Sequence, residues 1–281
     1  MPIHDQSYRR YKGHRSALGR SWLVIATAGI KQTIKKRVFL GILLFAWGQF
    51  LVRAVMLWFA ENVPQTAAIL APSAETFREF LDKQGFFVFI VTIYVGAGLI
   101  ANDRRANALQ IYLSKPLLRS EYIAGKAAIL FTFLMMVTWL PAILLLFLQV
   151  MFAGSFAFMK ANLFLFPAIT VASLLQVLLA TFTMLALSSL SKSSRYVSVL
   201  YSGILFFSAA IYGAMYAITG GNTSFSYLSL GANLAQVMDV IFRLPARYST
   251  PWQVSLIVIL GLIAVSISVL ERRVRGVEVV T

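Results

Sequence analysis

No cysteine occurs in this sequence of 281 residues, which also has only two histidines and ten acidic residues. The lack of cysteine excludes disulfides, thiolate metal sites and cysteine nucleophiles. Both histidines, His4 and His14, stand in the polar N-terminal stretch, and the long hydrophobic runs contain no Asp, Glu or His. We therefore expect no catalytic residue, no metal site and no proton relay inside a membrane.

Apolar residues, in contrast, are abundant: 59% of the chain is hydrophobic, 12% is charged and the mean hydropathy is +0.78. A soluble domain cannot bury that much apolar surface, whereas runs of about 18 apolar residues cross a membrane as helices. We predict an all-α integral membrane protein with six spans, at Val38–Ala60, Phe86–Ala101, Tyr122–Phe152, Leu163–Leu190, Tyr196–Ile218 and Trp252–Leu270. The second run is short, so its helix is expected to begin earlier or to end later.

The net charge of +15 is distributed as membrane topology requires, not as a nucleic-acid site. With the N-terminus inside, the inner segments hold nineteen Lys and Arg and the outer segments five, with Arg53 inside a span. Because Lys and Arg are enriched in cytoplasmic loops, both termini are predicted to be cytoplasmic, and no nucleic-acid partner is expected. The expected layout is a basic tail with an interfacial helix (1–37), a membrane domain (38–271) and a cytoplasmic tail (272–281).

Two amphipathic helices are predicted outside the spans. In the segment 16–37, apolar residues recur at helical spacing opposite a basic side, which suits the surface of an anionic leaflet; they are Leu18, Trp22, Ile25, Gly29 and Ile30. The second helix covers about 231–243 on the outer side. It has an apolar face, and Asp239 and Arg243 are expected to form an i,i+4 ion pair on its other side.

The connection between the second and third spans, residues 102–121, is rich in charge. A short helix is predicted over 103–113, and Pro116 ends it because the residue before proline avoids helical angles. A helix with exposed apolar side chains framed by charges is typical of a docking surface. The expected docking residues are Asp103, Arg104, Arg105, Leu109, Tyr112, Leu113, Lys115, Pro116 and Arg119.

The stretch DRRANALQIYLSKPLLRSEYIAGK resembles the loop after the second span in permease subunits of the ABC-2 family. In that loop an acidic residue, a basic pair, a Leu-x-x-x-Leu-Ser-x-Pro stretch, an Arg and a Gly-Lys recur at these spacings. Six spans, an amphipathic N-terminal helix, an outer helix and the closing LERRVRG are similar to the same family. One departure is Asn107, where the family commonly has glycine; Asn tolerates unusual backbone angles nearly as well.

The resemblance implies a subunit of a transporter in the inner membrane of a bacterial or archaeal cell. The connection 102–121 is then the coupling helix that docks onto a separate ATPase subunit, present in two copies, and a second permease half completes the assembly within membrane lipid. This chain has no phosphate-binding loop of its own, since Ser120 and Ala127 replace the required residues around Gly125-Lys126. ATP and magnesium therefore belong to the partner, and no cofactor is expected on this chain.

The resemblance implies that the second and fifth spans line the path between two permease halves, which makes polar residues of these spans candidates for the lining: Thr92, Tyr94, Ser208 and Tyr212. Gln49 and Arg53 of the first span are further candidates to line a cavity. Arg53 either extends to the outer headgroups or, with Gln49 one turn earlier, faces the protein interior. A weakly polar, aromatic lining favours export of amphipathic or lipid-like cargo. Two further classes stay open: a membrane anchor or scaffold that recruits a partner without transport, and a membrane-embedded enzyme, for which catalytic residues are missing.

Overall fold

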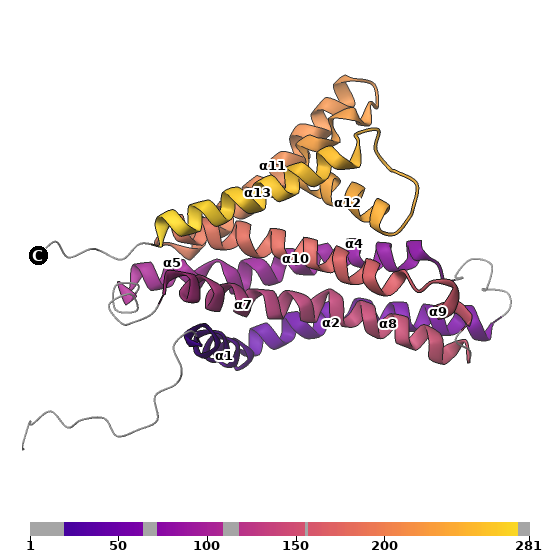
Figure 1. Cartoon of the computed structure of the whole chain (residues 1–281), viewed down its shortest axis with the longest axis horizontal. Helices are drawn as coiled ribbons and strands as arrows, with labels where there is room; N and C mark the ends of the chain where they lie inside the picture. The colour runs from indigo at the N-terminus through magenta and orange to yellow at the C-terminus, as the bar shows by residue number, and fades with distance from the viewer. Residues whose placement is uncertain (1–19, 64–71, 109–117, 155–156, 275–281) are drawn as a thin grey trace, which may run out of the picture.

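The computed structural model describes residues 20–63, 72–108, 118–154 and 157–274. Within these ranges the chain is helical and forms no strand (Figure 1). Six helical stretches are long and apolar enough to cross a membrane: Arg37–Asn62, Ala74–Arg105, Arg119–Phe152, Leu165–Leu190, Ser194–Ile218 and Trp252–Arg273. The prediction of an all-α chain with six candidate spans is confirmed.

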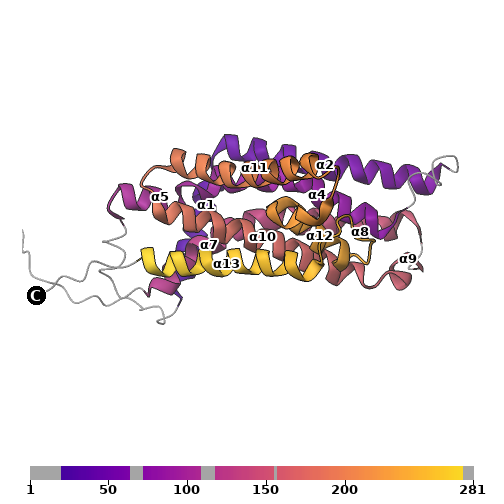
Figure 2. The same cartoon turned by 90° about the horizontal axis from the view of Figure 1, so that it is seen from above.

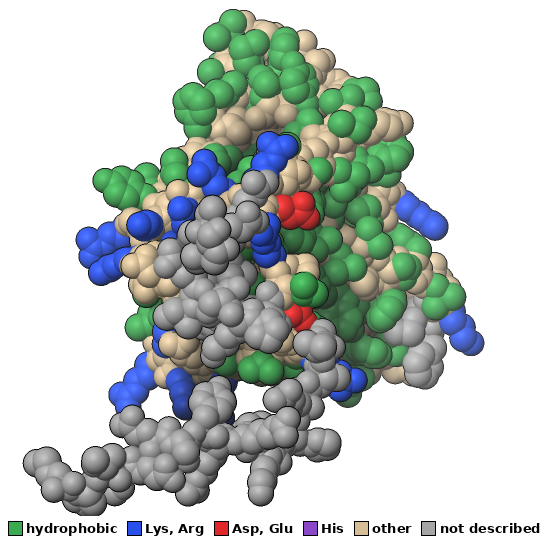
Figure 3. All heavy atoms as spheres, turned by 60° about the vertical axis from the view of Figure 1, so that its left-hand side comes forward, with side chains coloured by type: hydrophobic (Ala, Val, Ile, Leu, Met, Phe, Trp, Pro, Cys, Tyr) green, Lys and Arg blue, Asp and Glu red, His purple; other side chains and the backbone are tan. Residues whose placement is uncertain are grey.

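The spans lie lengthwise beside one another (Figure 2). In chain order the elements are α1 (Ser21–Ile34), α2 (Arg37–Asn62), α4 (Ala74–Val91), the π-helix η1 (Thr92–Gly96), α5 (Gly98–Arg105), α7 (Arg119–Val137), α8 (Trp139–Phe152), α9 (Ala157–Ala161), α10 (Leu165–Leu190), α11 (Ser194–Ile218), the 3-10 helix η2 (Thr223–Leu228), α12 (Leu230–Ile241) and α13 (Trp252–Arg273). The end of α5, the start of α7 and the end of α13 lie at one end of the bundle, near α1 (Figure 1). Lys and Arg side chains gather there, and we call it the basic end (Figure 3).

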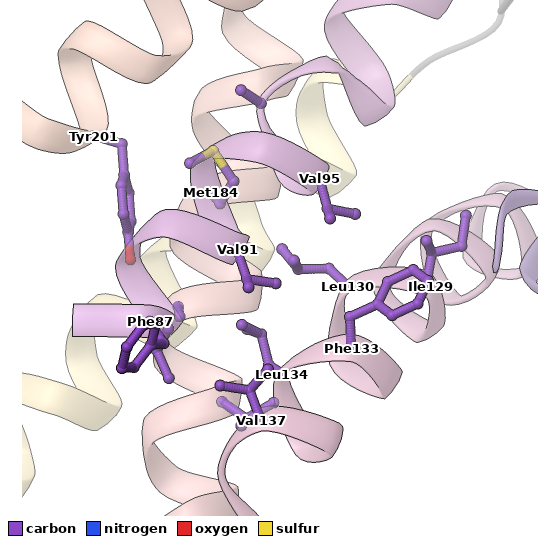
Figure 4. Packing of buried hydrophobic residues seen from close by; sticks show 14 of the residues in the cluster. Phe87, Val91, Val95, Ile129, Leu130, Phe133, Leu134, Val137, Met184 and Tyr201 are labelled. Carbon is purple, nitrogen blue, oxygen red and sulfur yellow. The ribbon is translucent and has the colours of Figure 1, made fainter. Parts of the chain in front are cut away.

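The six spans differ in how much protein surrounds them. In the second, third and fourth spans, 56%, 61% and 56% of the most apolar stretch is buried, against 11% in α2, 11% in α11 and 22% in α13. The core beside α2 is made mainly by the second span and α7, with side chains from α10 and α11 (Figure 4); it includes Phe87, Val91, Val95, Leu130, Phe133, Leu134, Met184 and Tyr201. The second, third and fourth spans therefore form the centre, and the other three are peripheral.

The second span extends beyond the predicted Phe86–Ala101 at both ends, to Ala74–Arg105. It starts at a capping box formed by Ser73 and Thr76. Its first turns contain Glu75, Glu79 and Asp82, so the expectation that the spans lack acidic residues is wrong. The reason is that these polar turns bury Phe77, Phe80 and Leu81 on one face, while Glu79 pairs with Arg53 of α2 and Asp82 pairs with Arg247 before α13.

The third span is interrupted at Thr138, between α7 and α8. Pro141 has no backbone N–H, so the carbonyl of Val137 lacks its helical donor. The buried Gln84 of α4 replaces that donor: its Nε2 donates to Val137 O at 2.7 Å and to Ala46 O of α2 at 3.2 Å. One carboxamide thus ties three spans together at the proline break.

The N-terminal helix begins at Ser21 in the described residues, within the predicted 16–37. It packs on α7, with Ile25, Gly29 and Ile30 of its predicted apolar face half-buried and Trp22 exposed. Gly29 lies against Ile129, and a Cβ at Gly125 would come within 2.9 Å of the Trp22 carbonyl oxygen. Because neither glycine has a side chain, the two helices approach closely at these two points. Lys31 and Lys35 of α1 remain exposed.

The helix predicted over about 231–243 is present as α12, with the bounds Leu230–Ile241. It contacts α4, α10, α11 and α13. The expected pair between Asp239 and Arg243 is wrong. Arg243 follows the helix end with a positive φ of 58° and lies over the Phe164 ring, 4.4 Å from its centroid, whereas Asp239 is buried against other arginines.

Candidate functional site

The two ends of the connection 102–121 are bonded to each other at the basic end. Asp103, in the last turns of α5, accepts a hydrogen bond from the Tyr122 hydroxyl at 2.7 Å and pairs with Lys126 Nζ at 2.7 Å. Tyr122 and Lys126 are neighbours one turn apart on α7. A displacement of the connection is therefore shared by the second and third spans.

A further bond extends this unit to the fourth span. Arg104 donates from Nη1 to the carbonyl oxygen of Ser189, near the end of α10. At the start of α7, Glu121 accepts from the backbone N–H of Leu118 at 3.2 Å, which satisfies a free donor of that helix end. The spans that meet at this connection are the three most buried in the chain.

The predicted helix over 103–113 is wrong at its start, because α5 ends at Arg105 and the chain turns at Asn107. Asn107 has a φ of 52°, the left-handed conformation that ends helices and that asparagine adopts more readily than most residues. The predicted docking residues Leu109, Tyr112, Leu113, Lys115 and Pro116 lie outside the described residues. Arg105 and Arg119 are exposed on either side of them.

The Gly125-Lys126 pair has a structural use in this fold. Gly125 provides the close contact with α1, and Lys126 pairs with Asp103. Both residues lie within the helix α7, away from a helix N-terminus where phosphate groups bind. The pair is therefore part of the packing at the basic end.

The second span has a built-in irregularity between its two halves. Residues Thr92–Gly96 form a π-helix, and the Ser188 hydroxyl of α10 is inserted just after it. Ser188 Oγ donates to Ala97 O at 2.9 Å and accepts from the N–H groups of Ile100 and Ala101 at 3.1 and 3.0 Å. Such insertions bend helices, and single π turns occur often at functional positions. The Ser188 hydroxyl thus supplies partners for backbone groups of span two next to the π turn.

At the opposite end, charges from three segments form one network. Arg247 donates to both Asp239 oxygens, from Nε to Oδ2 at 2.8 Å and from Nη2 to Oδ1 at 3.0 Å, and to Asp82 Oδ2 at 3.0 Å. Arg78 pairs with Asp82, and its Nε lies 3.4 Å from Asp239 Oδ1. Burial raises the pKa of the Asp239 carboxyl to about 6, while Arg78 acts in the opposite direction. The network fastens α12 and the segment before α13 to span two.

The six predicted lining residues lie in three separate places. Arg53 Nη2 is 2.5 Å from Glu79 Oε2 of α4, with Gln49 half-buried one turn earlier. Tyr94 stacks on Phe39 near the start of α2, about 20 Å along that helix from Arg53, and Thr92 is fully buried beside it in the π turn.

Ser208 and Tyr212 of α11 face the segment between α11 and α13. Ser208 Oγ accepts from the N–H of Leu230 at 3.4 Å, and the Tyr212 ring meets the Tyr248 ring edge-on at a centroid distance of 5.9 Å. The six residues therefore do not form one continuous surface within this chain.

Sequence reasoning missed four buried polar residues that connect or line the central spans: Gln84, Gln176, Thr183 and Ser188. The available signal was a single polar side chain within an apolar helix, which costs free energy unless it has a partner. Gln176 and Thr183 line a partly open cavity of about 270 Å³ between α4, α10, α11 and α12.

None of the protein-family models compared with this chain matches it, and no curated protein matches it either.

Proposed function

We propose that this chain is the membrane-spanning permease subunit of an ATP-binding cassette transporter, an exporter of amphipathic or lipid-like cargo. A separate ATPase subunit, in two copies, docks on the connection 102–121, and a second permease half completes the assembly in the inner membrane of a bacterial or archaeal cell. ATP and magnesium are bound by the partner. The basic end is then the cytoplasmic face, in keeping with the nineteen inner against five outer Lys and Arg.

The observation that carries this proposal is the bonded unit at the base of the connection. Asp103 joins α5 to Tyr122 and Lys126, and Arg104 joins it to Ser189. A force applied between Arg105 and Arg119 reaches three spans at once through these bonds. In the second span it meets the π turn at Thr92–Gly96, where the helix can bend. Rigid-body movement about such a point is a common way of coupling a distant event to a change of shape.

Two other observations support a moving assembly of several chains. Helix α1 packs on α7 directly beside the connection, through Gly29 and Gly125, so that it moves with the unit. The peripheral helices α2 and α11 present large apolar side chains outward, including Leu44, Phe45, Val199, Phe206 and Phe207. These faces are available to lipid and to a second permease half.

The alternative, an anchor or scaffold, needs the same docking surface but no movement. Two sets of variants separate the candidates. Leu109→Asp with Tyr112→Asp should abolish co-purification of the ATPase while the protein stays in the membrane. Asp103→Asn should keep the ATPase bound but lower cargo-stimulated ATP hydrolysis about tenfold, because the base of the connection is loosened.

Unchanged co-purification in the Leu109/Tyr112 variant would exclude docking at the connection. Bound ATPase whose activity never depends on this subunit or on cargo would favour the scaffold.

A further inference from the structure

The cavity between α4, α10, α11 and α12 lies within a single chain, away from the basic end. Its wall is mostly apolar, with side chains such as Phe89, Leu179, Leu205 and Met238, one from each helix. Ligand sites in proteins share this composition: an apolar wall with a few polar groups that fix orientation. The peripheral wall is α11, whose outward side chains are exposed.

Two polar side chains in this wall have unused hydrogen-bonding capacity. Gln176 and Thr183, two turns apart on α10, are 5% and 6% exposed, and neither Gln176 Oε1 nor Thr183 Oγ1 has a partner among the described residues. A buried polar oxygen without a partner costs about 1–3 kcal/mol. A bound molecule that donates a hydrogen bond removes this cost.

The size of the cavity decides between water and a larger occupant. A volume of about 270 Å³ equals about nine water molecules at ~30 Å³ each, and each water needs two to four polar partners. Two unpartnered oxygens in a mostly apolar wall offer few anchors for that number, which favours a larger, mainly apolar occupant. An apolar cavity of about 150 Å³ binds benzene, so this one accommodates a molecule of about ten non-hydrogen atoms.

The charged side chain in the cavity wall is already paired, which disfavours an ionic ligand. Asp82 is the one charged residue in the wall, and its Oδ2 already accepts from Arg78 and Arg247. A cationic or anionic group in the cavity would therefore find no free charge of opposite sign, and burying an unpaired charge in an apolar site is costly.

We infer that this cavity binds a neutral amphiphile of about ten non-hydrogen atoms, or the end of a longer chain of that kind. Its hydroxyl or amide group bonds to Gln176, and its apolar body lies between α4, α11 and α12. Asp82 and α12 both line the cavity, and both take part in the ion network through Asp82 and Asp239. An occupant therefore lies next to the contacts that fasten α12 to span two. Binding requires this chain only, and so stands apart from the proposed transport function.

The test uses the purified full chain in lipid nanodiscs and a diazirine-bearing octan-1-ol as photoreactive probe, with mass spectrometry to locate the label. We expect saturable labelling of peptides from α10 or α12, displaced by octan-1-ol and not by octane. Gln176→Leu should weaken saturable labelling about fivefold, the effect of one hydrogen bond, and Ala235→Phe, which fills the cavity, should abolish it. Gln32→Leu on the exposed side of α1 is the matched control and should label like the native chain.

Three results would overturn the inference: displacement by octane as effective as by octan-1-ol, native labelling in both Gln176→Leu and Ala235→Phe, or label confined to the outward faces of α2 and α11. The Ala235→Phe result decides the matter if Gln176→Leu does not fold. Since no ATPase is present, failure here leaves the co-purification test of the proposed function untouched, and the reverse also holds.

Discussion

The two ends of the bundle use charge in opposite ways. At the basic end, Lys31, Lys35, Arg119, Lys192 and Arg273 are exposed, and within the described residues the ion pair at that end is Lys126 with Asp103. At the other end, Arg53, Arg78 and Arg247 all pair with carboxylates of neighbouring helices. The comparison teaches that most cations at one end are left exposed to the surroundings, whereas those at the other end hold helices together.

The largest effect is expected from a test of which end faces the cytoplasm. The native chain has no cysteine, so single cysteines report without background. Lys160→Cys and Asn222→Cys should react with an impermeant thiol reagent added to intact cells, and Lys192→Cys should react only after the membrane is opened. The reverse labelling would place the basic end outside and remove the basis for ATPase docking.

Breaking the ion network should give the next largest effect. Asp239→Ala leaves Arg78 and Arg247 without their shared, buried carboxylate, and removing one partner of a buried pair costs about 3–5 kcal/mol. Lys83→Ala, at the same end, removes an exposed charge 3.9 Å from Glu79 and should change the free energy of unfolding by less than about 0.5 kcal/mol. The measurement is unfolding by SDS in mixed micelles; equal losses in the two variants would contradict an end held by its charges.

Much of this architecture could be predicted from the sequence because hydrophobic length alone identifies spans. The periodicity in 231–243 also predicted α12 correctly, and the tolerance of asparagine for unusual angles anticipated the φ of 52° at Asn107. An extension of span two beyond Phe86–Ala101 was predicted and is confirmed, but its extent could not be predicted, since Thr76 to Lys83 have the composition of a soluble helix. Only contacts show that these charges have partners within the bundle.

The partners themselves could not be predicted, because they come from distant segments. Asp239 meets Arg78, 161 positions earlier, and Arg247, eight positions later, although Arg243 has the ideal helical spacing. A helix end at Ile241 turns Arg243 away onto Phe164. Likewise, nothing in the sequence indicates that Gln84 meets Val137, since that pairing depends on how three helices pack around Pro141.

A smaller effect is expected at Arg53, which the structure pairs with the half-exposed Glu79. Arg53→Leu should lower the free energy of unfolding by about 1 kcal/mol, as for a partly exposed ion pair. The single Nη2 contact needs charge and not a planar fork, so Arg53→Lys should retain most of the stability, and exchange of the two charges (Arg53→Glu with Glu79→Arg) should restore part of it. If Lys is as damaging as Leu, the guanidinium has a second partner in the assembled protein.

The smallest effect on stability, and the sharpest test of the comparison, is expected at the basic end. Lys31 and Lys35 are exposed on α1 and have no ion pair within the described residues, so Lys31→Gln with Lys35→Gln should leave unfolding in neutral detergent unchanged within about 0.5 kcal/mol. In nanodiscs the outcome should depend on the lipid. Each Lys near an anionic surface contributes about 1 kcal/mol of attraction, so anionic lipid should stabilise the native chain relative to zwitterionic lipid, and the double variant should lose most of that difference.

Gln32→Ala, a neutral change on the same exposed side of α1, is the control and should keep the full lipid dependence. High salt should reduce the difference in the native chain, because exposed charges are screened over about 10 Å at 0.1 M. A double variant that unfolds more easily in detergent would show that these lysines, like the arginines at the other end, hold the fold together. In that case the two ends would differ in degree and not in kind, and the basic end would lose its role as the surface kept free for partners.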